Sequence, residues 1–271
     1  MWLDRHIHLY YIDNYNLIQE FHKDDGQPLI PGPLCGKVKV SPDSDLSVIR
    51  ALSPETDYCS DRRLYYIDPD GNIQEHMWNS TGSIQERLFS GEWTKGDSFE
   101  EGITPRKGSR LQFINLAFLE TMAPRPRAFI QTEDEDLRSL KFDTLSWRFS
   151  TLRQKLPFSD NAAVFAACLG SEGAVVPAIF IFWQETDGKI YCRSRRIMSV
   201  SWSLRPTWGG KKAVSEEDEG NINVMASVCG SHTRGQYKDN LHLFVSGKDT
   251  SVFKHYKRLK ESWVAQIVKL A

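Results

Sequence analysis

A five-residue string that occurs twice constrains the fold of this chain more than any other feature. Leu9–Asp13 reads LYYID, and the same string recurs at Leu64–Asp68. Nine residues after each leucine comes the same triplet, IQE, which begins at Ile18 and again at Ile73. A match with conserved internal spacing, at a period of tens of residues, is typical of stacked or radial repeats. The chain is therefore expected to be built from copies of one structural unit.

Each copy has the residue pattern of a β-hairpin. Aromatic and β-branched residues predict a strand, Pro69-Asp70-Gly71-Asn72 has turn chemistry, and Ile73 resumes the extended run. Weaker copies follow later in the chain. Glu133–Leu140 and Val252–Leu259 could pass as short helices, but neither sustains a helical period, so both are predicted to be strands. The sequence thus predicts five hairpins, near residues 8–21, 63–76, 127–141, 178–192 and 241–256.

The repeating unit is longer than a hairpin. Ile18, Ile73, Leu137, Ile190 and Val252 hold equivalent positions with spacings of 55, 64, 53 and 62 residues, near the length of a four-stranded propeller blade. A short apolar run precedes the later hairpins, at 46–51, 111–117, 162–168 and 222–228. A tryptophan follows them, at Trp93, Trp147, Trp202 and Trp263. The predicted fold class is all-β: a single β-propeller domain over residues 1–271, with blades of four strands.

The first copy has no leading apolar run, so ring closure is left with two alternatives. Either the last strand, around Trp263, closes onto the first blade, or residues that precede Met1 supply the missing part. Five blades are recognisable, and a sixth, partial blade is left open.

Charge and composition exclude several classes of partner. The 271 residues contain 34 Lys and Arg against 35 Asp and Glu, a formal charge of −1, so the field that captures a polyanion is missing and no nucleic-acid partner is expected. No window approaches the roughly 20 apolar residues that span a bilayer, and charges stand where a secretory signal would be apolar. We expect no membrane association and a cytoplasmic location. Free buried thiols are expected at Cys35, Cys59, Cys168, Cys192 and Cys229.

No motif for a metal, a cofactor or a nucleophile stands out. His6 and His8 share a strand face but have no third ligand at metal spacing. Asp68-x-Asp70-x-Asn72 begins like a calcium loop, but the acidic residue required at the twelfth position is replaced by Asn79, which favours a plain hairpin turn. Gly-x-Ser-x-Gly is absent, and no cysteine sits in an activating signature. We therefore predict neither metal nor cofactor.

The string from Arg63 to Glu75 resembles the blade signature of the fungal fucose-specific lectins, which are six-bladed β-propellers. In that family an arginine begins the second strand of a blade, a glutamate follows twelve positions later, and both bind the fucose. Arg63 and Glu75 match this spacing. Aromatic rings of an adjoining blade pack on the apolar face of the sugar, and the candidates for this wall are Trp78, Trp93 and Trp147. The resemblance thus implies a fucosylated glycan as ligand.

The other copies depart from this signature. The equivalent positions read His8 and Glu20, Arg127 and Ser139, Phe180 and Cys192, and His242 and Lys254. Because a phenylalanine or a cysteine cannot replace a charged sugar ligand, these departures argue against multivalent fucose binding. With lectin-like blades and altered sugar-ligand positions, the chain also resembles a second group of proteins. These are lectin-like fungal hetero-Diels-Alderases, which join a tropolone-derived quinone methide to a humulene-type sesquiterpene.

The first interpretation is therefore a cofactor-free pericyclase whose substrates are an apolar polyene and a quinone methide. Such an enzyme needs a donor on the heterodiene oxygen and an acid or base near the substrate. The candidate residues are His8, Arg63, Tyr65, Arg127 and His242. One alternative is an L-fucose-binding lectin with a single complete site at Arg63 and Glu75, and another is a non-catalytic propeller scaffold. A homodimer is left open.

Overall fold

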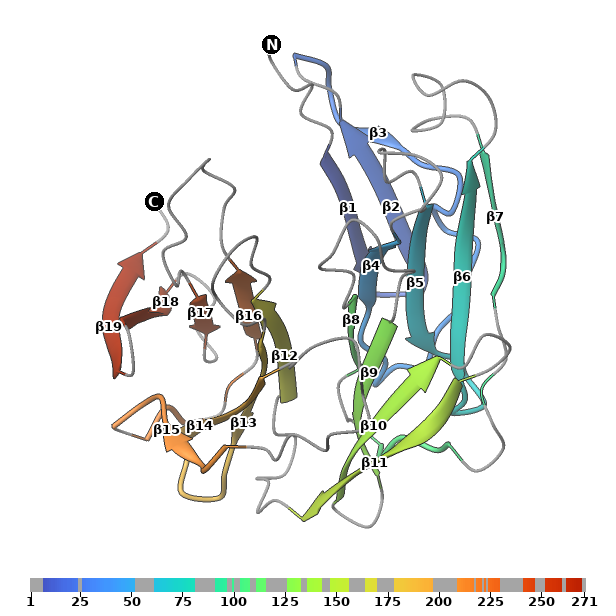
Figure 1. Ribbon diagram of the computed structural model, residues 1–271. Helices are drawn as coiled ribbons and strands as arrows, with labels where there is room; N and C mark the ends of the chain where they lie inside the picture. Colours follow the sequence, from blue (N-terminus) through green and yellow to red (C-terminus); the bar gives the residue numbers. More distant parts are fainter. Residues whose placement is uncertain are drawn as a thin grey trace.

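A computed structural model describes most of the strands of the chain and the turns between them. The described residues are 7–23, 26–51, 61–80, 91–96, 99, 103–107, 111–115, 126–132, 136–142, 147–155, 164–169, 178–196, 209–216, 218–220, 222, 224–229, 241–246, 252–259 and 262–269. Within them there are nineteen strands, which form five separate antiparallel sheets (Figure 1). This part of the chain contains no helix long and apolar enough to cross a bilayer. The predicted all-β fold is confirmed.

Each sheet is one blade. The first blade has three strands, β1 (Ile7–Ile12), β2 (Ile18–Lys23) and β3 (Ile30–Pro31). The second has β4 (Ser47–Ala51), β5 (Asp61–Ile67), β6 (Ile73–Ser80) and β7 (Gly91–Lys95). The third has β8 (Gln112–Asn115), β9 (Pro126–Gln131), β10 (Asp136–Phe142) and β11 (Trp147–Lys155).

The last two blades also have four strands each. The fourth blade has β12 (Val164–Leu169), β13 (Ala178–Gln184), β14 (Ile190–Arg196) and β15 (Lys212–Ala213). The fifth has β16 (Val224–Cys229), β17 (Leu241–Ser246), β18 (Val252–Leu259) and β19 (Ser262–Lys269). In all five sheets, neighbours along the chain are neighbours in the sheet.

The expected order of apolar strand, hairpin and tryptophan-bearing strand is confirmed with one departure. The two stretches that could have been helices form β10 and β18. Trp93, Trp147 and Trp263 lie on the fourth strands β7, β11 and β19. In the fourth blade, however, the fourth strand is the short β15, and Trp202 lies outside the described residues.

The second to fifth blades are arranged around their first strands. β4 contacts β8, β8 contacts β12, and β12 contacts β16, so the leading apolar strands lie innermost and the later strands of each blade lie further out (Figure 1). The alternative in which the last strand closes onto the first blade is not observed. Among the described residues β19 pairs with β18, and no strand of the fifth sheet pairs with β1. The physical reason is that β19 is the regular outer strand of its own blade.

The repeated LYYID string ends in the same kind of turn in the first two blades, although the turn residues differ. Asp68 Oδ1 accepts hydrogen bonds from the amides of Asp70 and Asn72, at 3.0 and 2.8 Å, and Gly71 adopts a positive φ of 87°. In the first blade Asp13 Oδ1 accepts from the amides two and four residues later, at 2.8 and 2.9 Å. These donors lower the pKa of the Asp13 carboxyl. The acidic string at residue 68 is thus a hairpin turn, as predicted.

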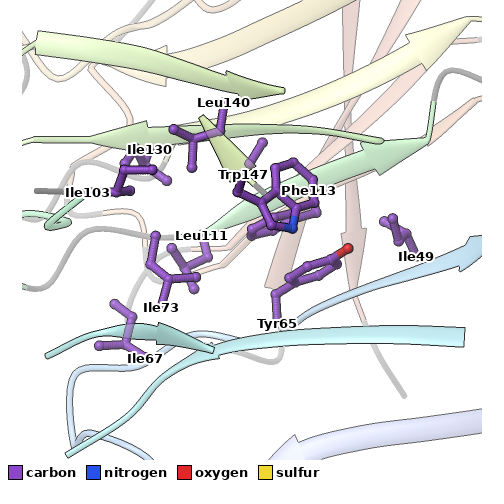
Figure 2. Close-up of a cluster of buried hydrophobic side chains, with 11 residues drawn as sticks. Ile49, Tyr65, Ile67, Ile73, Ile103, Leu111, Phe113, Ile130, Leu140 and Trp147 are labelled. Carbon is purple, nitrogen blue, oxygen red and sulfur yellow. The ribbon is translucent and has the colours of Figure 1, made fainter. Parts of the chain in front are cut away.

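The central strand β5 is buried on both faces. Leu64 and Tyr66 pack toward the first blade, in a cluster with Ile18, Leu34 and Val40. Tyr65 and Ile67 point the other way, into a larger cluster with residues of the third blade (Figure 2). Because alternate side chains of a strand face opposite sides, burial between two blades requires a nearly continuous apolar run. The repeated LYYID string meets this requirement in β5.

Truncation of Leu64 tests the packing between the first two blades. Leu64 has no exposed surface, so Leu64→Ala should lower the free energy of unfolding by about 2–5 kcal/mol. The same change at Leu29, which is 45% exposed, should have little effect. Urea unfolding of both variants measures the difference, and equal losses would contradict the predicted interface.

Candidate functional site

A buried polar group lies between the second and third blades. Arg63 on β5 and Glu75 on β6 form an ion pair with 3.0 Å between Arg63 Nη1 and Glu75 Oε1. The Tyr65 hydroxyl donates a hydrogen bond to the same oxygen at 2.6 Å. Tyr65 and Glu75 are directly opposite in the antiparallel register. The predicted pairing of Arg63 with Glu75 is therefore observed, and the hairpin itself creates it.

Aromatic side chains of the third blade surround this polar group. Tyr65 stacks face to face on Phe113, with ring centroids 3.5 Å apart, and Trp147 stands edge-on to Tyr65 at 5.7 Å. The Arg63 guanidinium lies over the ring of Phe142 at 5.5 Å. Figure 2 shows Tyr65, Phe113 and Trp147 converging from the two blades. The charged pair thus sits against rings that a neighbouring blade supplies.

Trp147 brings an unused hydrogen-bond donor to this interface. Its side chain is fully buried, and its indole Nε1 has no hydrogen-bond partner. In Figure 2 that nitrogen lies on the edge of the ring that faces Tyr65. A buried donor without a partner costs about 1–3 kcal/mol, and such groups in native proteins call for an explanation.

Burial and charge act together on Arg63 and Tyr65. Burial works against the charged form of Arg63, but the Glu75 carboxylate outweighs it and raises the pKa of Arg63 above its ordinary value. Burial, followed by the nearby Glu75 charge, raises the pKa of Tyr65 well above its ordinary value of 10.0. Tyr65 therefore remains a protonated donor at physiological pH, and Arg63 remains a cation. Arg63 is the member of this group that reaches solvent, with 23% of its side chain exposed.

A second glutamate, Glu20, lies between the first and second blades and has a different set of donors. Its carboxylate accepts hydrogen bonds from Tyr10 Oη at 3.2 Å, the Leu34 amide at 2.9 Å and Trp93 Nε1 at 3.0 Å. Trp93 comes from the second blade as Trp147 comes from the third. Here, however, the indole donor is used by the protein itself. The Glu20 carboxylate is internally satisfied.

Arg62, which sequence reasoning passed over, fills the rest of this interface. Its Nη1 donates to the ring nitrogen Nε2 of His8 at 2.8 Å, and its guanidinium lies 4.6 Å from the centre of the Trp78 ring. Trp78 in turn contacts Trp93 edge-on at 5.6 Å. Because consecutive residues of β5 point to opposite faces, Arg62 and Arg63 serve different interfaces.

The structure therefore divides the five residues expected to bind a ligand. Arg63 and Glu75 form an ion pair between the second and third blades, and Trp147 reaches this group through its contact with Tyr65. Trp78 and Trp93 lie with His8 on the other side of the second blade. Of the catalytic candidates, Arg63 and Tyr65 are in contact with Glu75, and His8 is in contact with Arg62. The predicted wall of three tryptophans is not one surface.

The remaining blades have no glutamate at the equivalent position. Ser139 lies opposite Phe129, and Cys192 lies opposite Phe182. Arg127 on β9 pairs with Lys141. Burial raises the pKa of the Cys192 thiol to about 11, so this thiol is not an activated nucleophile.

The equivalence expected in the fifth blade is wrong by one residue. The sequence alignment placed Lys254 at the glutamate position, but the register pairs Lys254 with Val245 and places His255 opposite Phe244. Lys254 therefore lies on the other face of the strand, where its Nζ is 2.8 Å from Glu219 Oε2. His242 lies on β17, and its side chain is outside the described part of the structure. A connection that differs by one residue flips the face of every later side chain, which spacing alone does not reveal.

No group of three or more metal-ligating side chains occurs in the part of the chain that the structure describes. Cys35 and Cys192 are free thiols there. Cys192 is buried, as expected, but Cys35 is partly exposed, and Cys59 lies outside the described residues.

Comparisons with known proteins agree with this architecture. No protein-family model matches the chain. It is 28% identical over 140 residues to a fucose-specific lectin of Aspergillus fumigatus, 26% over 186 residues to that of Aleuria aurantia, and 25% over 248 residues to lectin g276 of Arthrobotrys oligospora. These matches cover 51%, 68% and 89% of this chain, and 39%, 52% and 56% of the respective relatives. The chain thus spans about half the length of the curated relatives it matches.

Solved structures place the fold. AofleA from Arthrobotrys oligospora superposes with a TM-score of 0.74 at 17% identity, covering 98% of this chain and 69% of that one. The Aleuria aurantia lectin, described as a six-bladed β-propeller, gives a TM-score of 0.65 at 17% identity and covers 98% and 78%. This chain has a β-propeller fold. Five blades of the lectin-like propeller are seen in its described residues.

His76, next to Glu75 on β6, faces the first blade and gives the structure a pH dependence. Tyr66 Oη lies 3.2 Å from His76 Nδ1. Burial, followed by the nearby charge of Lys95, lowers the pKa of His76 from 6.5. The unfolded chain therefore binds a proton at this histidine before the folded chain does.

Stability should fall as the pH drops from 7 toward 5, because the unfolded state gains the proton first. His76→Gln should reduce this loss. Thermal unfolding of both proteins at pH 8, 7, 6 and 5 measures the loss of stability. At pH 8 the histidine is neutral, so a difference between the two proteins there reports only the lost contact with Tyr66. Parallel curves for the two proteins would show that His76 is not the source.

Proposed function

We propose that this protein binds fucosides through one site, formed by Arg63, Glu75 and Trp147 between the second and third blades. The observation that carries the proposal is the Arg63–Glu75 ion pair, because Tyr65, which donates to the same carboxylate, also contacts the ring of Trp147, whose indole donor has no partner. Similar proteins are named fucose-specific lectins, and an Aleuria aurantia lectin has been solved with alpha-methyl-L-fucoside, at 20% identity and a TM-score of 0.67 over 97% of this chain and 74% of that one.

The chemistry of the three groups suits a sugar. A guanidinium donates hydrogen bonds to hydroxyl oxygens in a fixed direction, and a carboxylate accepts hydrogen bonds from hydroxyl groups. The pair can therefore bind adjacent hydroxyls with charge-assisted bonds. The Trp147 N–H would donate to a further sugar oxygen. Rings such as Phe142 can pack on the apolar C–H face of the sugar. Glu75 and Trp147 are buried without ligand, so a sugar reaches them only when neighbouring side chains move.

We expect a single binding site because the other blades have different residues at the equivalent positions. Between the first and second blades the indole donor of Trp93 already binds Glu20, and a histidine stands in place of the arginine. The third and fourth blades have Ser139 and Cys192 in place of the carboxylate, and the fifth has His255. Affinity for multivalent glycans would therefore not exceed that of the single site.

Removal of the Arg63 guanidinium should weaken binding strongly. Calorimetry with methyl-α-L-fucoside is expected to give one site per chain, and Arg63→Ala should lower the affinity by about 10–100-fold, the loss typical of a charged hydrogen bond. Arg127→Ala is the matched control, because Arg127 occupies the same strand position in a blade without the glutamate. Equal effects of the two variants, or no binding to the unaltered protein, would overturn the proposal.

The two indole donors should differ in their effect on the ligand. Trp147→Phe removes the donor that has no partner, and we expect a fucoside affinity at least about tenfold lower. Trp93→Phe removes a donor that is bound to Glu20, and we expect the affinity to stay within about twofold of the unaltered protein. The opposite order would place the sugar between the first and second blades.

A hetero-Diels-Alder pericyclase is the second candidate function. It is favoured by the loss of the arginine and glutamate pair in four of the five blades, which suggests reuse of the scaffold. Arg63 and Tyr65 would be the donors available to the heterodiene oxygen. This function predicts no retention on a fucose resin, and protein-dependent yield and stereochemistry from a quinone methide precursor and a humulene-type polyene. A non-catalytic scaffold predicts neither result.

A further inference from the structure

The five blades can be compared with one another at an equivalent cross-strand pair of residues. In the first two blades a tyrosine faces a glutamate, and in the other three a phenylalanine faces a residue that is not acidic. The pairs are Tyr10 with Glu20, Tyr65 with Glu75, Phe129 with Ser139, Phe182 with Cys192, and Phe244 with His255. The phenol hydroxyl is thus present where the carboxylate is present and absent where it is absent.

Packing does not account for this pattern. Tyr65, Phe129 and Phe182 are all buried to within 2% of their surface, so the aromatic ring fills the same kind of site with or without the oxygen. A phenol differs from a phenyl ring by a polar group that must find a partner when it is buried. The carboxylate is that partner in both blades, because Tyr10 and Tyr65 both donate to Oε1 of the facing glutamate.

The other oxygen of each carboxylate lies so close to a glycine that a larger residue there would clash with it. A Cβ atom on Gly96 would lie 2.6 Å from Glu75 Oε2, and one on Gly32 would lie 2.7 Å from Glu20 Oε2. Each glycine amide also donates to the backbone carbonyl of its glutamate, at 2.8 Å in both blades. A hydroxyl on one side and a glycine on the other therefore recur together around both carboxylates.

We propose that Tyr65 and Gly96 are positioning residues of the fucoside site: the Tyr65 hydroxyl fixes Glu75 Oε1 beside Arg63, and Gly96 leaves room for Oε2. The inference rests on the proposed function for its ligand, but the placement of the carboxylate can be observed without one. The burial of Tyr65 keeps its hydroxyl protonated and able to donate. Neither residue needs to touch the sugar.

Tyr65→Phe and Tyr10→Phe form a matched pair for the test. Both changes remove one hydroxyl from a glutamate and keep the ring, so a purely structural role predicts similar effects of the two on binding. We expect Tyr65→Phe to weaken methyl-α-L-fucoside binding about tenfold and Tyr10→Phe to leave it within twofold. Thermal unfolding of both variants checks that each is folded.

Gly96→Ala tests the second half of the inference without touching an aromatic ring. The added methyl group should push the Glu75 carboxylate away from Arg63 and weaken fucoside binding at least about tenfold. Gly210→Ala is the control, because a Cβ there meets no atom within 4 Å. Crystal structures of unliganded Tyr65→Phe and Gly96→Ala should show the Glu75 carboxylate displaced from its position beside Arg63.

The outcomes separate the inference from the proposed function. A carboxylate that stays in place in both crystal structures overturns the positioning role, whatever the sugar does. Unchanged fucoside affinity in both variants also overturns it. If the unaltered protein binds no fucoside, the proposed function fails, and the two crystal structures still decide whether Tyr65 and Gly96 position the carboxylate.

Discussion

The burial of two carboxylates between blades is the constraint on which the candidate site depends. Glu20 and Glu75 are each only 1% exposed, and a buried carboxylate is tolerated only when donors or a cation surround it. The hairpin supplies the first donor, since a tyrosine stands directly opposite each glutamate. Each carboxylate can accept further hydrogen bonds, and the two interfaces differ in the donors that supply them.

The two interfaces meet that demand in different ways. Glu20 is held by a backbone amide and the Trp93 indole, and the neighbouring Arg62 is engaged with His8 and Trp78. Glu75 is held by Arg63, and the corresponding indole of Trp147 is left without an acceptor. One copy of the repeat has thus become a closed structural contact, and the other keeps a donor available. Of these two interfaces in the described part of the chain, only the one at Glu75 therefore keeps a free donor for a ligand.

The fourth blade has apolar residues at the positions that correspond to Arg63, Tyr65 and Glu75. In the fourth blade Phe180, Phe182 and Cys192 form a buried cluster with side chains of the fifth blade. Exchange of charged groups for apolar ones of similar size removes the desolvation cost and retains the packing between blades. The packing between these two blades therefore does not require the charged groups found at Arg63 and Glu75.

The sequence by itself determined the hairpins, their turns and the pairing of Arg63 with Glu75. These depend on contacts between residues close in the chain, where alternation along a strand and the turn at Asp68 set the register. Only the tertiary structure decided which tryptophan meets which carboxylate, because Trp93 lies 73 residues beyond Glu20 and reaches it through blade packing. It also revealed Gly96, Phe142 and Arg62 around the two carboxylates, and the one-residue shift that moves Lys254 to the opposite face. Contacts between blades depend on how the sheets pack, and the face of a side chain depends on the exact length of the preceding turn. A repeat pattern predicts neither of these.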